Sequence, residues 1–98
     1  MFARMNTFNG PPEGLDGLTR VAEEKVLPAA DRLPGFRGML VLGDRATGKS
    51  ISITLWETEE AMLASEQAAN KLRQEANTAG GTQTAAVERF EVLLDRSR

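Results

Sequence analysis

The segment Ile51–Trp56 constrains the fold most, because apolar and polar residues alternate along it with a period of two. Such alternation is typical of a β-strand with one buried face. The strand follows Gly43–Ser50, which matches the phosphate-binding pattern G-x-x-x-x-G-K-[ST] at every position. A genuine phosphate-binding loop leads into a helix, whose N-terminal amides hold the phosphates. We therefore interpret Asp44–Gly48 as a hairpin turn, with Gly48 at positive φ, and expect no nucleotide at Gly43–Ser50.

Composition argues against several classes of function. The 98 residues carry 12 basic and 14 acidic side chains, a near-balance that is unlike a nucleic-acid-binding protein. The chain has no histidine, cysteine or tyrosine, and so lacks the commonest metal ligand and the commonest general base. Residues 1–5 lack an apolar run long enough for a signal peptide or a membrane span. We expect a cytoplasmic protein of one domain, residues 1–98, with no metal, cofactor, nucleic-acid or membrane partner.

The spacing of apolar residues predicts the element order β-α-β-β-α-β. The four segments expected to be strands are residues 1–8, 36–42, 49–57 and 85–94. Two split β-α-β units of this kind make an α+β ferredoxin-like plait. In that fold a four-stranded antiparallel sheet carries both helices on one face.

The two helices are predicted from stripes of apolar residues. The first stripe consists of Leu15, Leu18, Val21, Ala22, Val26, Ala29 and Leu33. Pro28 interrupts this stripe and should kink or end the helix. The second helix should begin after the N-cap Thr58, and its charged side, Glu66–Arg73, should face solvent.

The second strand is apolar on both of its faces. We expect Phe36, Leu40 and Leu42 on one face, and Met39 and Val41 on the other. Helices on one side of the sheet can cover only one of these faces, and the other then needs a different cover. A second copy of the chain, related by a two-fold axis, is the simplest cover. We therefore expect a homodimer formed by sheet-to-sheet packing.

Three phrases of the sequence, Leu33–Gly38, Ile53–Glu60 and Val87–Val92, resemble the dimeric α/β-barrel superfamily. Within that superfamily they resemble the antibiotic-biosynthesis-monooxygenase-like branch. The resemblance implies a pocket between the sheet and the helices of each subunit. Members of the branch include cofactor-independent monooxygenases of aromatic polyketides, haem-degrading enzymes and many proteins without a known activity.

The resemblance carries over to few functional residues. Asn6 resembles the strand-one asparagine of the haem-degrading branch, but the tryptophan and proximal histidine of that branch's second helix are absent. We therefore do not expect haem degradation by that mechanism. The polyketide monooxygenases use asparagine, tryptophan, tyrosine and arginine around an aromatic substrate. Asn6, Trp56 and a nearby arginine are candidate counterparts, whereas the tyrosine is missing.

Asn6 and Arg4 are the candidate polar groups of a ligand site. Asparagine is disfavoured in mid-strand, so Asn6 has two interpretations. It belongs to a functional site, or it lies at a sheet edge or a solvent-filled cavity. Arg4 shares its face, where it can hold an anionic or phenolate oxygen or pair with Glu88 or Glu91. Each of these side chains therefore has a functional and a structural interpretation.

The candidate aromatic contacts to a ligand are Trp56, Phe36 and Phe90. Trp56 can form the wall of a flat pocket, with its indole N–H as a donor, or pack where the third strand meets the second helix. Phe36 and Phe90 are typical of a core or barrel interior, and we include them among the ligand-binding candidates. No catalytic residue is assigned from the sequence.

Two classes of function remain open. The first is a non-catalytic dimeric barrel that binds a small apolar or aromatic molecule between sheet and helices, or serves as an assembly module. The alternative is a cofactor-independent monooxygenase, in which an aromatic substrate itself donates the electron to O₂. Asn6 and Arg4 would then stabilise the resulting oxyanion inside an apolar pocket.

Overall fold

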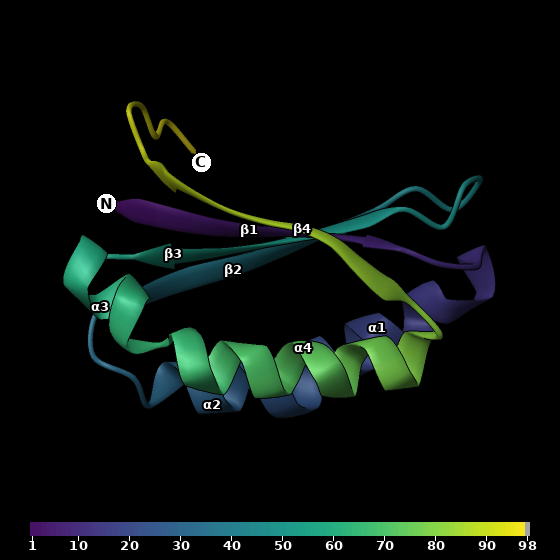
Figure 1. The fold of residues 1–98 in the computed structure, drawn as a ribbon. Coiled ribbons are helices and arrows are strands. Elements are labelled where there is room, and N and C mark those ends of the chain that lie inside the picture. Colours follow the sequence, from purple (N-terminus) through teal and green to yellow (C-terminus); the bar gives the residue numbers. More distant parts are fainter. Residues whose placement is uncertain (98) are drawn as a thin grey trace.

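The computed structural model describes residues 1–97 and contains one four-stranded antiparallel sheet with helices on one face (Figure 1). The strands are β1 (Phe2–Asn9), β2 (Phe36–Gly43), β3 (Ser50–Trp56) and β4 (Gln83–Glu91). Their spatial order is β2-β3-β1-β4, with β1 and β3 in the centre. The predicted α+β ferredoxin-like plait is therefore confirmed, and the predicted end of the last strand was three residues too long.

The first helical segment continues through Pro28, so the proline does not end the helix, which was one of its two predicted effects. It comprises η1 (Pro12–Gly14), α1 (Leu15–Val21), η2 (Ala22–Val26) and α2 (Leu27–Asp31). The η2 segment is a π-helical turn, in which the N–H of Leu27 reaches back five residues to the oxygen of Ala22. Since Pro28 has no N–H to donate, the wider turn before it lets the helix pass the proline without breaking.

The second helical segment is divided at one residue. It consists of α3 (Glu59–Ala64) and α4 (Glu66–Gly80). Thr58 caps α3 as predicted, because its Oγ1 accepts a 3.1 Å hydrogen bond from the N–H of Ala61. The single helix that the sequence predicted is interrupted at Ser65, whose hydroxyl donates to the oxygen of Met62 at 2.7 Å. A serine that bonds locally to the backbone competes with a regular helix.

The loop between β2 and β3 is the predicted hairpin turn. Gly48 donates to the oxygen of Asp44 at 2.8 Å, and Asp44 donates to the oxygen of Lys49 at the same distance. Gly48 has a φ of +84°, and a Cβ there would lie 1.9 Å from the oxygen of Gly10. The phosphate-loop pattern therefore lies between two strands, and its second glycine serves a turn packed against the end of β1.

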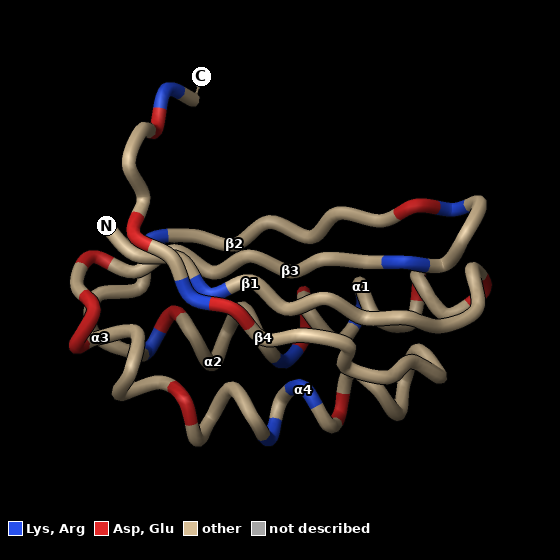
Figure 2. Tube along the Cα trace, turned by 45° about the horizontal axis from the view of Figure 1, so that its top comes forward, with Lys and Arg blue, Asp and Glu red and all other residues tan. Residues whose placement is uncertain are grey.

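The two faces of the sheet differ in their cover. The helix-facing side chains of the central strands are buried and include Arg4, Asn6, Phe8, Ser52, Thr54 and Trp56. The other face carries apolar side chains without helices over them, among them Met5, Leu40, Leu42, Ile51, Ile53 and Leu55. In Figure 2 the three strands β1 to β3 carry little charge between their ends, whereas β4 carries a charged stretch. Leu40 and Leu42 are 55% and 49% exposed, so an apolar surface remains uncovered.

Phe36 lies on a different face from the one we predicted. The pairing of β2 with β3 shifts between Phe36 and Gly38, so one extra residue enters the strand there. Phe36 therefore lies opposite Trp56 on the helix-facing side, instead of sharing the open face with Leu40 and Leu42. A one-residue bulge reverses the face of every residue before it.

The two helical segments contact each other backbone to backbone where the first segment begins and α4 ends. A Cβ on Gly14 would lie 1.8 Å from the oxygen of Gly80, so the two backbones touch directly. The buried core beside this crossing is built from Phe8, Leu18 and Ala76. Within residues 1–97, no helix has the length and apolar character needed to span a membrane.

Candidate functional site

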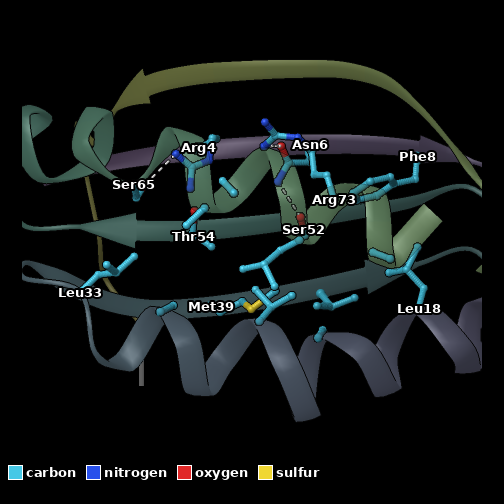
Figure 3. Close-up of a pocket in the computed structure, with 18 of the residues that line it drawn as sticks. Arg4, Asn6, Phe8, Leu18, Leu33, Met39, Ser52, Thr54, Ser65 and Arg73 are labelled. Atoms are coloured by element: carbon cyan, nitrogen blue, oxygen red, sulfur yellow. Dashed lines mark hydrogen bonds between the residues drawn. The ribbon is translucent and has the colours of Figure 1, made fainter. Parts of the chain in front are cut away.

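A small cavity lies between the helix-facing side of the sheet and the helices, with a volume of about 60 Å³. Figure 3 shows that its two sides differ in polarity. The polar side comes from β1, β3, α4 and the residue between α3 and α4, and consists of Arg4, Asn6, Ser52, Thr54, Ser65 and Arg73. The apolar side comes mainly from the first helical segment and β2, and includes Leu18, Ala22, Val26, Leu33, Met39 and Val41. This arrangement suits a molecule with an apolar body and one polar end.

Asn6 is buried and hydrogen-bonded at both ends of its amide. Its Nδ2 donates to the hydroxyl of Ser52 at 2.9 Å, and its Oδ1 accepts from Nη1 of Arg73 at 3.0 Å. Arg73 can only donate, so the amide oxygen must face it, and this fixes the orientation of the amide. One N–H of Asn6 remains for a further partner.

Arg4 is the most deeply buried charge of the site, at 3% exposure. Its Nη1 donates to the hydroxyl of Ser65 at 2.9 Å and to the oxygen of Met62 at 3.2 Å. The guanidinium carbon lies 5.6 Å from the centre of the Trp56 ring, a cation–π distance. The Nε of Arg4 is buried and has no hydrogen-bond partner. Burial lowers the pKa of Arg4, because the charged form is desolvated.

Glu66 is the carboxylate that balances Arg4, in place of the predicted Glu88 or Glu91. Its Oε1 lies 3.2 Å from Nη1 of Arg4, and both of its oxygens accept from Arg89, at 2.7 and 2.8 Å. Glu88 pairs with Met5 in the sheet and so lies on the opposite face. The hydrogen bonds from Arg89 hold the pKa of Glu66 below its ordinary value.

Positive charge is in surplus beside the polar side of the cavity. Arg4 and Arg73 line the cavity, and Glu66, outside the lining, is paired with Arg4 and with Arg89. Burial lowers the pKa of Arg73, and the nearby charge of Arg4 lowers it further. Like charges held together in a partly desolvated place favour an added negative charge.

Of the predicted aromatic contacts, Trp56 alone lines the cavity. It is 1% exposed, and its indole N–H already donates to Thr54 Oγ1 at 3.0 Å, so it offers a wall and no free donor. Phe36 packs edge-on against Trp56, with ring centres 5.4 Å apart, and stands behind the cavity wall. Phe90 pairs with Ala3 on the open face, is 49% exposed, and lies away from the cavity.

The sequence interpretation missed four polar residues that line the cavity, Ser52, Thr54, Ser65 and Arg73, and the carboxylate of Glu66 next to them. Ser52 and Thr54 are the polar positions of the alternating strand, and they face the helices, whereas alternation is usually polar towards solvent. Glu66 and Arg73 were assigned to a solvated helix face, and this was wrong. Their spacing of seven residues places both on one side of α4, which was the available signal.

A metal site is not evident among the described residues. Within residues 1–97 no group of three or more His, Cys, Asp or Glu side chains is arranged to hold a metal ion. What the cavity offers instead is an apolar volume beside guanidinium, amide and hydroxyl groups.

The profile of the antibiotic biosynthesis monooxygenase family matches residues 1–73 of this chain. The chain belongs to this family. The match confirms the resemblance on which the sequence analysis drew. Among curated proteins, the uncharacterized proteins Rv2557 and Rv2558 of Mycobacterium tuberculosis (strain ATCC 25618 / H37Rv) are each 34% identical over 93 and 97 residues. The alignments cover 94% and 96% of this chain, but only 41% and 39% of the relatives' own length.

Several solved structures share the fold of this chain at low sequence identity. The cofactor-independent oxygenase SnoaB from Streptomyces nogalater has a TM-score of 0.68 at 17% identity, covering 96% of this chain and 94% of its own. The haem degrader MhuD of Mycobacterium tuberculosis, with two hemes bound, has a TM-score of 0.71 at 24% identity, covering 99% and 100%. A dimeric ferredoxin-like protein from an uncultured marine organism has a TM-score of 0.61 at 11% identity, covering 99% and 91%.

Proposed function

We propose that this protein binds a small aromatic molecule carrying an anionic or strongly polarised oxygen. The observation that carries the proposal is the unpartnered Nε of Arg4, buried beside an apolar cavity. A buried N–H without a partner costs free energy, and an oxygen of a ligand would satisfy it. The remaining amide N–H of Asn6 is a second donor on the same side of the cavity.

The charge of the site favours the ionised form of such a ligand. Arg4 and Arg73 are both partly desolvated, and Glu66 shares its charge with Arg4 and Arg89. Opposite charge nearby lowers the pKa of an acidic hydroxyl group. A bound phenol or enol should therefore lose its proton more readily than in water.

Binding of 1-naphthol tests this proposal, because its fluorescence depends on ionisation. We expect saturable binding, a lowered pKa of the bound naphthol, and much weaker binding of naphthalene, which lacks the oxygen. Arg4→Met should abolish the preference for 1-naphthol over naphthalene. Arg45→Met is the matched control, because Arg45 is 75% exposed and lies at the hairpin. Equal binding of 1-naphthol by the parent and by Arg4→Met would contradict the proposal.

A second candidate function is cofactor-independent monooxygenation of the bound molecule. The family match and the fold shared with SnoaB favour it. An activated methylene next to the ionised ring would give up both hydrogens, gain one oxygen atom from O₂ as a carbonyl, and release the other as water. Since the methylene carbon supplies all four electrons that reduce O₂ to the carbonyl oxygen and water, no other reductant enters. Arg4 and Asn6 would stabilise the oxyanion from which the first electron leaves.

Oxygen consumption with anthrone tests this second candidate. Anthrone carries such a methylene, and the product would be anthraquinone, with one O₂ consumed per product. We expect Arg4→Met to lose the activity. If anthrone binds tightly but is oxidised no faster than in buffer, the monooxygenase candidate is contradicted and ligand binding remains the proposed function.

We also propose that the protein forms a homodimer through the open face of its sheet. Leu40, Leu42 and Phe90 are each about half exposed on this face, a contiguous apolar surface that water disfavours. The same fold occurs in a protein described as dimeric and ferredoxin-like. A dimer of this kind leaves each cavity on the far side of its own sheet.

A further inference from the structure

The cavity is small for the ligand that the proposed function requires. Its volume is about 60 Å³, whereas an apolar cavity of about 150 Å³ is a known host for one benzene molecule. The present volume has room for only a few water molecules. A ligand with a fused ring system must therefore reach beyond the cavity.

A second hollow of about 410 Å³ lies next to the cavity, between the start of β2 and α3. It is lined mainly by Pro34, Gly35, Glu57, Ala61 and Ala64. Leu33 and Ser65 line both this cleft and the cavity, so these two side chains stand between them.

Of the two dividing residues, Leu33 is the one able to move. Ser65 is 3% exposed and is fixed by its hydrogen bonds with Arg4 and Met62. The side chain of Leu33 is half-buried and is held by packing alone. The backbone around it is anchored, because Leu33 donates to Ala30 at 2.9 Å and Gly35 accepts from Glu57 at 2.7 Å. A change of rotamer at Leu33 would therefore join cavity and cleft without moving the loop.

We infer that the ligand site has two parts, the buried cavity and this cleft, and that Leu33 determines the size of ligand admitted. The inference rests on the proposed function, and it adds how a ligand larger than the cavity is held. The oxygen of such a ligand lies at Arg4 and its far ring lies in the cleft. Glu57 and Glu60 are exposed at the cleft, so the far ring carries no negative charge.

The test compares 1-naphthol affinity, by fluorescence titration, in two variants and a control. Ala64→Trp fills the cleft from an exposed helix position without touching the cavity. We expect it to weaken 1-naphthol binding by roughly tenfold or more. Leu33→Ala removes the partition and should speed association by roughly tenfold. Leu63→Ala is the matched control, because Leu63 is half exposed on α3, lines neither hollow, and should change little.

Thermal unfolding of each variant establishes that it is folded. If Leu33→Ala does not fold, the affinity of Ala64→Trp alone is sufficient to test the two-part site. Affinity within about twofold of the parent in Ala64→Trp, together with loss of binding in Arg4→Met, would overturn the two-part site and leave the proposed function standing. Absence of saturable 1-naphthol binding by the parent would overturn both. Weakening by Ala64→Trp with no effect of Leu63→Ala supports the two-part site.

Discussion

Arg73 and Asn6 are joined by a 3.0 Å hydrogen bond although 67 positions separate them in the chain. The bond ties α4 to the centre of the sheet. It also sets the direction of the Asn6 amide, whose nitrogen then reaches Ser52 on the neighbouring strand. A charged helix residue, a strand amide and a strand hydroxyl thus form one connected row beside the cavity.

Asn6→Ala should lower the free energy of unfolding by roughly 1–3 kcal/mol, because Arg73 and Ser52 each lose a partner. Asn70→Ala is the control, since Asn70 also accepts from Arg73 but is exposed. Urea denaturation of both variants measures the difference. Unchanged or higher stability of Asn6→Ala, with 1-naphthol binding lost, would show instead that Asn6 is kept for the ligand at a cost in stability.

Acid should destabilise the protein through Glu66. Hydrogen bonds from Arg89 lower the pKa of Glu66 from its ordinary value of 4.5. A carboxylate of this kind stabilises the fold above its unfolded-state pKa, and the contribution is lost as the pH falls through the folded-state pKa. We expect the free energy of unfolding to decline below about pH 4.5, and Glu66→Gln to reduce that decline.

Urea denaturation between about pH 3 and pH 7 checks the role of Glu66. Glu24→Gln, an exposed change on η2, should leave the pH dependence as it is in the parent. If Glu66→Gln and the parent lose stability in parallel as the pH falls, then Glu66 does not carry this effect.

Leu40→Lys should convert the proposed dimer to monomers, because it places a charge on the open face of the sheet, where Leu40 is 55% exposed. The parent interface should bury more than about 1,000 Å² in total. Light scattering at micromolar concentration measures the mass of each form. Leu63→Lys, an exposed leucine on α3, should remain dimeric. A monomeric parent would refute the proposed dimer.

Gly48→Ala should cost about 1–3 kcal/mol of stability, since the residue has a φ of +84° and no room for a Cβ. Lys49→Ala, next to it, should change the stability by less than about 0.5 kcal/mol. Calorimetry with ATP should give no saturable heat for the parent. Saturable ATP binding that Lys49→Ala abolishes would restore the phosphate-loop interpretation.

The fold followed closely from the sequence where local pattern and tertiary packing agree. The alternation of β3, the N-cap Thr58 and the turn at Gly48 each act through neighbouring residues, so a single sequence reveals them. The extra residue beside Phe36 was missed, because a bulge depends on pairing with another strand. The passage of the helix through Pro28 was missed for a related reason, since a π-turn leaves no compositional mark.

The candidate site could be predicted only in part. Asn6 stood out because asparagine is unusual in mid-strand, and Arg4 followed as its neighbour on the same face. The spacing of Glu66 and Arg73 places both on one side of α4, but spacing alone does not reveal that this charged side turns towards a cavity. Their partners lie 62 and 67 positions away in the chain, beyond the reach of local spacing.

The direct contact of Gly14 with Gly80 has a consequence for how this scaffold can diversify. At that end a Cβ on Gly14 would collide with the oxygen of Gly80 at 1.8 Å, and a Cβ on Gly80 would be crowded, 3.1 Å from the oxygen of Gly14. At the other end the helices are separated by side chains, with Leu33 and Ala64 among them, and these can vary in size without disturbing the crossing. Relatives with different ligands should therefore retain the glycines and differ around residues 33 and 64. Sequence variation among them should be low at the glycine end of the molecule and high at the end that contacts the ligand.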